Sequence, residues 1–252
     1  MTGTSPSSTR KTTETSLLVL EAIEDLEGAT LSDIAEYTSL ATSTVHTHLR
    51  TLENAEYVTQ MGDEYHLGLK LFHIGEHARR RDSRYRLAKQ AAFELANRVG
   101  EDVNFAVAEY GRSIILFDET TAPSDEGFQV GRYFHMHSSA SGKAMLAEYS
   151  DERVEAIVDR WGLPELTENT ITDFRQLRAE IEEIREQGYA VNRQEELDGL
   201  KAVAMAVNEP DGSLFGTLDV SGPSYRLAAV EEIVNELRPA VEELERTIES
   251  HE

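Results

Sequence analysis

The sequence predicts a two-domain protein, with an N-terminal α+β winged helix-turn-helix, a linker helix and a C-terminal α+β domain. Residues 31–58 show the pattern of two short amphipathic helices joined by a tight turn and followed by the start of a β-hairpin. After residue 101, strands alternate with helices, and the segment in between is mostly helical. These changes of pattern place the boundaries at 13–75, 76–90 and 91–252, after a polar tail at 1–12 that we expect to be disordered.

The first helix of the motif has one apolar stripe, formed by Leu31, Ile34 and Ala35. Ser32 precedes two acidic residues, Asp33 and Glu36. We therefore predict that Ser32 caps the N-terminus of this helix, where the helix dipole favours acidic side chains.

The second helix is predicted to begin with Thr42 or Ser43 as its cap, and Val45, Leu49 and Leu52 recur on one apolar face. Short polar side chains and one arginine on the opposite face suit phosphates and base edges in the major groove of DNA. The residues of this predicted DNA-binding face are Thr42, Ser43, Thr44, His46, Thr47, Arg50 and Thr51.

A hairpin over residues 57–66 follows, with Met61, Gly62 and Asp63 at its turn. In a winged helix-turn-helix this hairpin is the wing, which contacts the DNA backbone beside the recognition helix. Other small helical domains show similar patterning, so the pattern alone also fits a domain that binds no DNA.

The linker, mostly helical over residues 67–98, contains a basic cluster of Arg79, Arg80, Arg81, Arg84 and Arg86. Two interpretations remain open. The cluster either contacts phosphate or a second subunit beside DNA, or it is a solvated helix face paired with nearby acids.

The chain is strongly acidic, with 24 Lys and Arg against 47 Asp and Glu and a net charge of −23. Residues 1–90 hold 10 basic and 13 acidic residues, residues 91–252 hold 14 and 34, and only five of the basic residues are lysines. We hypothesise a halophilic source, because an acidic surface poor in lysine suits concentrated salt; an ordinary acidic bacterial protein is the alternative. Ionic contacts to phosphates weaken as the salt concentration rises. We therefore expect this protein to recognise DNA mainly through contacts to base edges and through hydration.

The composition also bounds the class of protein. There is no cysteine, which excludes disulfides and thiolate metal sites. No apolar run is long enough to span a membrane, and the polar N-terminus does not resemble a secretory signal. We expect a cytoplasmic protein without membrane contact.

The second domain is predicted from its turn and cap residues. Gly111 separates two strands, Asp173 caps a helix, and Gly188 ends that helix. The predicted strands are 103–109, 112–117, 190–193, 202–207 and 214–220, and the predicted helices are 141–148, 151–161, 174–187 and 225–250.

No catalytic or metal motif is complete. Ser141-Gly142-Lys143 lacks the upstream glycine and the following Ser or Thr of a phosphate loop, and a Ser-x-x-Lys nucleophile would need serine where Ala140 stands. His73 and His77 share a helix face but have no carboxylate at ligand spacing. We expect neither enzymatic activity nor a metal or cofactor.

Motifs in both halves resemble the IclR family of transcriptional regulators. The N-terminal matches are LSDIA (31–35), STVH (43–46), LRTL (49–52) and YHLG (65–68). The C-terminal matches are HSSASGKAMLA (137–147), DG (211–212) and VSGPSYR (220–226). The resemblance runs from about Ser16 to Leu244 and implies a GAF- or PAS-like effector-binding domain after the winged helix-turn-helix.

The resemblance also implies where an effector binds. The main-chain N–H groups at the start of the helix near Ala140 can hold an anion. The family's pocket is lined by this helix start, by the segment after Gly188 and by the end of the penultimate strand, and Phe134 would add an apolar wall. The predicted effector-binding residues are Phe134, Ala140, Ser141, Asn192, Leu200, Ala202, Asp219 and Ser221.

Two of these residues depart from the family pattern. The family often has aspartate at the position of Asn192 and a small neutral residue at that of Asp219. This exchange favours a polyhydroxylated ligand, such as a sugar or sugar acid, over a bare keto acid, because carboxylates bind hydroxyls through charge-assisted hydrogen bonds. The alternative is that Asp219 points outward from an edge strand.

The sequence therefore predicts a regulator that binds a palindromic operator in double-stranded DNA as a homodimer or homotetramer. A small-molecule effector, either a sugar, a sugar acid or an organic acid, would shift operator affinity and so control genes of carbon catabolism. The alternative is a metabolite sensor that acts through protein–protein contacts instead of DNA.

Overall fold

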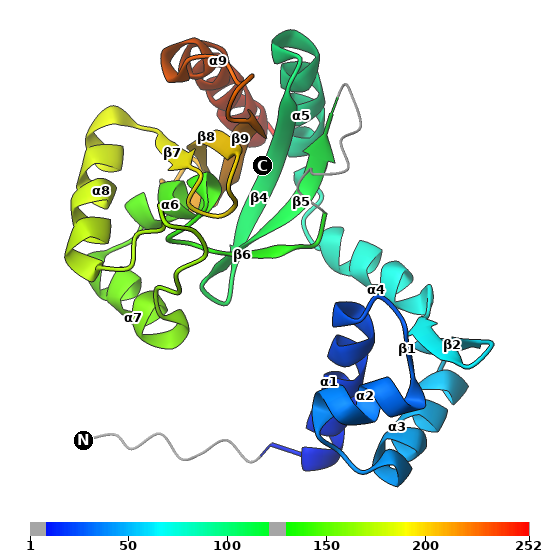
Figure 1. Ribbon diagram of the computed structural model, residues 1–252. Coiled ribbons are helices and arrows are strands. Elements are labelled where there is room, and N and C mark those ends of the chain that lie inside the picture. Colours follow the sequence, from blue (N-terminus) through cyan, green and yellow to red (C-terminus); the bar gives the residue numbers. More distant parts are fainter. Residues whose placement is uncertain (1–8, 121–129, 252) are drawn as a thin grey trace. The chain divides into compact units, whose positions relative to one another are not determined.

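A computed structural model describes residues 9–120 and 130–251. The chain divides into two compact units, with the boundary between Arg81 and Asp82 (Figure 1). Most of the predicted tail, residues 1–8, lies outside the described residues. The first helix begins at Lys11, so Lys11 and Thr12 are helical and do not belong to a tail.

The N-terminal unit is a winged helix-turn-helix. Its helices and strands, in chain order, are α1 (Lys11–Asp25), β1 (Ala29–Thr30), α2 (Leu31–Thr38), α3 (Thr42–Asn54), β2 (Val58–Met61), β3 (Glu64–Leu67) and α4 (Lys70–Arg79). The three strands form an antiparallel sheet with β3 in the middle. Ile34 of α2 and Val45 and Leu49 of α3 are fully buried in the core, as their helical spacing predicts.

Both predicted helix caps in this motif are wrong by one or two residues. Thr30 caps α2: its hydroxyl accepts the Asp33 N–H at 3.3 Å, and Asp33 accepts the Thr30 N–H at 3.1 Å in return. Ser32 lies inside the helix. The residue that caps α3 is Ala41, which has no side-chain hydrogen bond to offer, so neither Thr42 nor Ser43 is the cap.

The predicted linker helix at 76–90 is not continuous. Helix α4 ends at Arg79, and α5 (Tyr85–Val99) belongs to the second unit, which begins at Asp82 rather than at residue 91. No residue of α4 is buried within its own unit. Leu69 beside it and Phe72 within it are 85% and 68% exposed.

The basic cluster of the linker is paired with acidic side chains. Arg79 and Arg80 form ion pairs with Glu76, at 2.5 and 3.9 Å. Arg84 lies between Asp82 at 2.8 Å and Glu209 at 2.5 Å. The interpretation as a face paired with nearby acids therefore holds for these three arginines.

The C-terminal unit is built on a six-stranded antiparallel sheet (Figure 1). Its strands are β4 (Asp102–Glu109), β5 (Arg112–Glu119), β6 (Tyr133–His135), β7 (Ala190–Arg193), β8 (Leu200–Asn208) and β9 (Leu214–Pro223), in the spatial order β6-β5-β4-β9-β8-β7. Its further helices are α6 (Ala140–Ala147), α7 (Asp151–Trp161), α8 (Phe174–Gln187) and α9 (Val230–Glu249).

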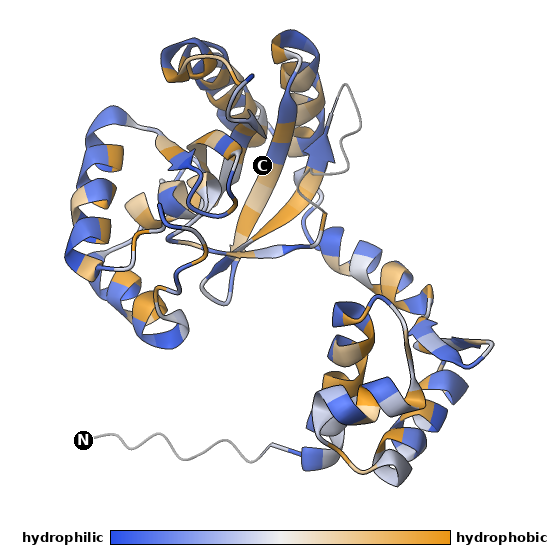
Figure 2. Ribbon diagram, viewed as in Figure 1, coloured by the Kyte–Doolittle hydropathy of each residue, from blue (hydrophilic) through white to orange (hydrophobic). Residues whose placement is uncertain are grey.

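Helices cover both faces of this sheet, and the two faces differ in side-chain size. Large apolar residues such as Phe105 and Leu218 pack against α5 and α9. Their strand neighbours Asn104, Ala106 and Asp219 point to the opposite face, where α6 lies. Figure 2 shows the corresponding mixture of apolar and polar residues along the strands. Small and polar residues on the α6 face leave room there for a cavity.

Several C-terminal elements match their predicted limits, including α7, α8 and β7. The closing helix α9 begins at Val230, five residues later than predicted. Strand β6, which supplies Phe134, was not predicted. Within the described residues, no helix is long and apolar enough to cross a membrane.

Candidate DNA-binding and effector sites

The predicted DNA-binding face of α3 is open to solvent. Six of its seven residues are exposed and Thr44 is half-buried, whereas Val45, Leu49 and Leu52 lie in the core. Arg50 is the one basic side chain among the predicted contacts. The exposed face is therefore polar and carries little positive charge.

Two threonines of this face bond to their own helix. The Thr47 hydroxyl donates to the Ser43 carbonyl at 2.9 Å, and the Thr51 hydroxyl donates to the Thr47 carbonyl at 3.0 Å. Their methyl groups and remaining acceptor capacity stay available to a partner. His48 lies elsewhere: its Nδ1 is 2.8 Å from the Ser16 hydroxyl of α1, so it ties α3 to α1.

In the C-terminal unit, a narrow cavity lies between the sheet and the start of α6. Its empty volume is about 300 Å³, with the open space at its mouth included. The residues that line it are Ala106, Ser113, Ile115, Phe134, Ser139, Ala140, Ser141, Asn192, Ala202 and Asp219.

A carboxylate forms the polar centre of this cavity. Asp219 is 5% exposed. One of its oxygens accepts the Ser141 hydroxyl at 2.7 Å, and the other accepts Asn104 Nδ2 at 3.0 Å. Burial raises the pKa of Asp219 to about 6, although both hydrogen bonds act to lower it. Asn104 also donates to the Ser221 hydroxyl at 3.1 Å, which extends the network along β9.

Asn192 presents a donor to the cavity. Its Oδ1 accepts the main-chain N–H of Glu195 at 2.8 Å, and this bond fixes the orientation of the amide because an N–H needs an acceptor. Its Nδ2 is fully buried and has no hydrogen-bond partner among the residues that the structure describes. A buried unpaired donor is costly, so this atom is a natural contact for an acceptor on a ligand.

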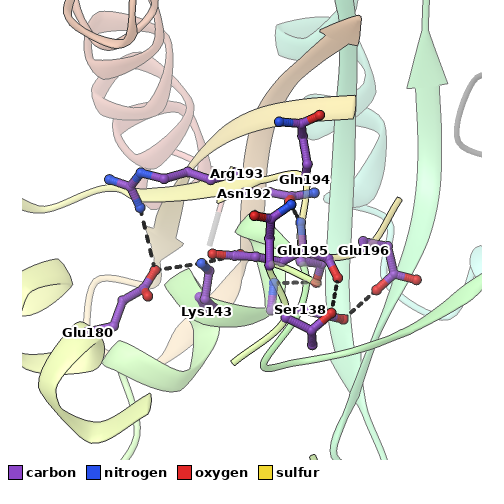
Figure 3. Close-up of polar contacts among 12 residues, drawn as sticks. Ser138, Lys143, Glu180, Asn192, Arg193, Gln194, Glu195 and Glu196 are labelled. Atoms are coloured by element: carbon purple, nitrogen blue, oxygen red, sulfur yellow. Dashed lines mark hydrogen bonds and ion pairs between the residues drawn. The ribbon is translucent and has the colours of Figure 1, made fainter. Parts of the chain in front are cut away.

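The segment after β7 is held in place by a buried lysine. Lys143 of α6 is completely buried, and its ammonium group pairs with Glu180 of α8 at 2.5 Å and with Glu195 (Figure 3). Burial raises the pKa of Glu195, while the Lys143 charge opposes that rise. Glu196 in turn accepts the hydroxyl of Ser138. These contacts fix the loop that carries the partner of Asn192.

Comparisons with known proteins bear on both units. The family described as "Bacterial transcriptional regulator IclR C-terminal" matches residues 84–249, and the "IclR helix-turn-helix domain" matches residues 12–62. The repressor AllR of Escherichia coli K12 is 30% identical over 220 residues, covering 85% of this chain and 80% of AllR. The chain belongs to the IclR family of transcriptional regulators.

Two further IclR relatives are informative. The probable regulator ArcR of Halobacterium salinarum is 26% identical over 221 residues, covering 84% of this chain and 83% of ArcR. An IclR homologue from Microbacterium hydrocarbonoxydans, in complex with 4-hydroxybenzoate, superposes with a TM-score of 0.77 at 25% identity. The superposition covers 95% of this chain and 100% of the homologue.

Membership of the IclR family confirms the resemblance found in the motifs. The chain is a transcriptional regulator, not an enzyme, with a DNA-binding helix-turn-helix domain and a C-terminal effector-binding domain. Within the described residues, no group of three His, Asp or Glu is arranged to hold a metal ion.

Of the eight predicted effector-binding residues of this IclR domain, six line the cavity. The other two are not among the lining residues: the Ser221 hydroxyl accepts a hydrogen bond from Asn104, and Leu200 is the first residue of β8, opposite Pro223. The alternative that Asp219 points outward from an edge strand is wrong, because β9 lies between β4 and β8.

Sequence reasoning missed the contribution of the β4–β5 hairpin to the IclR cavity. Ala106, Ser113 and Ile115 line it, and Asn104 holds Asp219. A signal was present: Asn104 interrupts the apolar run from Val103 to Ala108, where a polar side chain needs a buried partner.

Proposed function

We propose that this regulator controls genes for the catabolism of a carbon source by binding a palindromic operator in double-stranded DNA. A sugar or organic acid would be the effector. The observation that carries the proposal is that one chain has both an exposed polar face on helix α3 and a buried polar cavity in its other unit. We infer action in the cytoplasm, where operator DNA lies.

In this proposal α3 enters the major groove and the β2–β3 hairpin contacts the backbone beside it. Arg50 supplies the one charged contact from the predicted face, and the short polar side chains from Thr42 to Thr51 read base edges. Few phosphate contacts mean that affinity falls less steeply with salt than for a basic DNA-binding protein.

The effector would act by binding one arrangement of the DNA-binding units more tightly than another. Binding in the C-terminal cavity then changes operator affinity by the ratio of the two effector affinities. Asp219, Asn192 and the Phe134 ring are the proposed contacts, because they combine polar groups with an apolar wall.

We further propose self-association as a homodimer or homotetramer, because a palindromic operator matches a protein with two-fold symmetry. The exposed apolar side chains of Leu69, Phe72 and Ile74, at and within α4, support a contact between copies. Phe72→Glu is expected to lower the mass measured by light scattering. Leu166→Glu, on an exposed leucine of the other unit, is the matched control. An unchanged mass for Phe72→Glu would remove α4 from the interface.

The test of DNA binding begins with a genome-wide crosslinking map in the native host at its native salt, which yields the operator. Fluorescence anisotropy with that duplex in 0.1–2 M KCl, a range set by the salt dependence of phosphate contacts, then compares Arg50→Ala with wild type. We expect a loss of about tenfold or more, the size typical of one lost arginine contact. Arg175→Ala, whose side chain is 94% exposed in the other unit, is the control.

Full binding by Arg50→Ala, or an absence of crosslinking peaks under several carbon sources, would favour the second candidate. That candidate is a metabolite sensor whose helix-turn-helix unit contacts another protein. The single arginine on the predicted face of α3 is the observation in its favour.

A further inference from the structure

The start of α6 already has an anion beside it. Ser141 is in the first turn of this helix, and its hydroxyl donates to Asp219 at 2.7 Å. The first turn of a helix is where main-chain N–H groups and the helix dipole favour negative charge. The protein's own carboxylate therefore contacts the first turn of α6, beside the main-chain N–H groups that would stabilise the carboxylate of an acidic ligand.

Among the residues that the structure describes, no basic side chain lines the cavity to offset a second negative charge. Lys143 is on the same helix, but its ammonium is buried between Glu180 and Glu195 (Figure 3). Arg132 stacks over the Phe134 ring at 5.0 Å, and its charge acts on Glu196. An acidic ligand would meet Asp219 in a site of low dielectric with no cation of its own, where like charges repel strongly.

The polar atoms of the cavity need both donors and acceptors from a ligand. Asn192 Nδ2 is an unpaired donor, and each Asp219 oxygen accepts one hydrogen bond and can accept more. The Ser113 hydroxyl makes a long contact of 3.4 Å with the Ser139 hydroxyl, which leaves it capacity for a ligand. Hydroxyl groups match this set because each one donates and accepts.

The remaining walls are apolar. Phe134, Ile115, Ala106 and Ala202 offer only carbon atoms to the cavity from their side chains. A ring with hydroxyls along its edge and C–H groups on its face fits such a surface. The cavity is narrow, since its empty volume of about 300 Å³ includes the open space at its mouth, and this restricts it to small molecules.

We infer that the effector is a small neutral polyhydroxylated compound of the carbohydrate class, and that Asp219 is the residue that excludes carboxylates. This inference rests on the proposed role of the cavity as the effector site. It narrows the proposed effector from sugars, sugar acids and organic acids to neutral sugars and related neutral polyols.

The test uses the full chain and matched pairs of a neutral aldose and its aldonate, such as xylose with xylonate and glucose with gluconate, together with pyruvate. Isothermal titration is run on wild type, Asp219→Ser, Asp219→Asn and the exposed control Asp159→Ser. We expect wild type to bind an aldose at least about tenfold tighter than its aldonate, which corresponds to about 1.4 kcal/mol. Both Asp219 variants should shift that ratio at least about tenfold toward the aldonate, and the control should not.

Asp219→Asn keeps the side-chain shape, so it decides the outcome if Asp219→Ser does not fold. Three results would overturn the inference. Wild type could bind an acid more tightly than the aldoses, it could bind no aldose at all, or the Asp219 variants could keep the wild-type ratio of aldose to aldonate affinity. Operator binding, measured in parallel, separates the two claims. If wild type binds its operator and responds to an acid, the proposed function stands and the inference fails.

Discussion

The hydroxyl of Ser141 donates a 2.7 Å hydrogen bond to the carboxylate of Asp219, 78 residues away in the sequence. This contact joins the first turn of α6 to a central strand of the sheet. It places a buried charge at the centre of the cavity, and it makes the stability of the domain depend on the protonation state of Asp219.

Asp219→Asn is expected to stabilise the ligand-free protein at pH 7.5. Burial raises the pKa of Asp219 from 3.8 to about 6, so between these values the folded chain holds a proton that the unfolded chain has released. Stability therefore falls as pH rises through this window, by up to about 3 kcal/mol, and the variant avoids that loss.

Urea unfolding at pH 4.5, 6 and 7.5 measures the effect, with Asp159→Asn as the exposed control. A variant less stable than wild type at pH 7.5 would mean that the hydrogen bonds from Asn104 and Ser141 to the charged form outweigh its burial.

Lys143→Met is expected to lower the free energy of unfolding by about 3–5 kcal/mol, because it leaves the charge of the buried Glu195 without its partner. Adding Glu195→Gln should restore part of the loss, since the uncompensated charge is then removed. Lys201→Met, on a half-buried lysine of β8, is the matched control. Equal losses for Lys143→Met and Lys201→Met, measured by urea unfolding, would contradict this account.

Two helical glycines should respond to alanine with opposite signs. A Cβ at Gly142 of α6 would lie 2.4 Å from Met136 Cα, so Gly142→Ala must displace main chain and destabilise the protein. A Cβ at Gly75 of α4 meets nothing within 4 Å, so Gly75→Ala should raise the stability of its unit by about 0.5–1 kcal/mol. Thermal unfolding of both variants checks the pair. Destabilisation by Gly75→Ala would indicate a close neighbour in the assembled protein.

Stability is expected to rise with KCl concentration. The net charge of −23 produces self-repulsion in the folded chain, and added salt screens it. The midpoint of thermal unfolding between 0.1 and 2 M KCl, a range chosen to screen these charges fully, should increase by several degrees. A midpoint that is highest in dilute buffer would remove the hypothesis of a halophilic source.

Local signals in the sequence determined much of the fold. Helix α8 begins after Asp173, which caps it, and ends before Gly188, whose positive φ of +79° suits glycine. The recognition helix followed from the spacing of Val45, Leu49 and Leu52. Such signals act within a few residues, so they can be found without the tertiary structure.

The N-terminal cap of α2 shows the limit of local signals. Thr30 and Ser32 both precede acidic residues, and either pattern fits a cap. The choice depends on where the helix starts, and α2 starts directly after β1, which pairs with β3 some 35 residues later in the chain. A contact distant in sequence therefore decided a local feature.

By itself the sequence determined the family and the order of the two domains, because these follow from short motifs and periodic patterns. The resemblance to the IclR family then indicated six of the residues that line the cavity. Only the tertiary structure decided how those residues meet. Asn104 holds Asp219 because β4 and β9 are adjacent in the sheet, and Lys143 holds Glu195 because α6 packs beneath the loop after β7. These pairs are 115 and 52 residues apart, a separation at which strand order and packing, rather than local spacing, determine which side chains are neighbours.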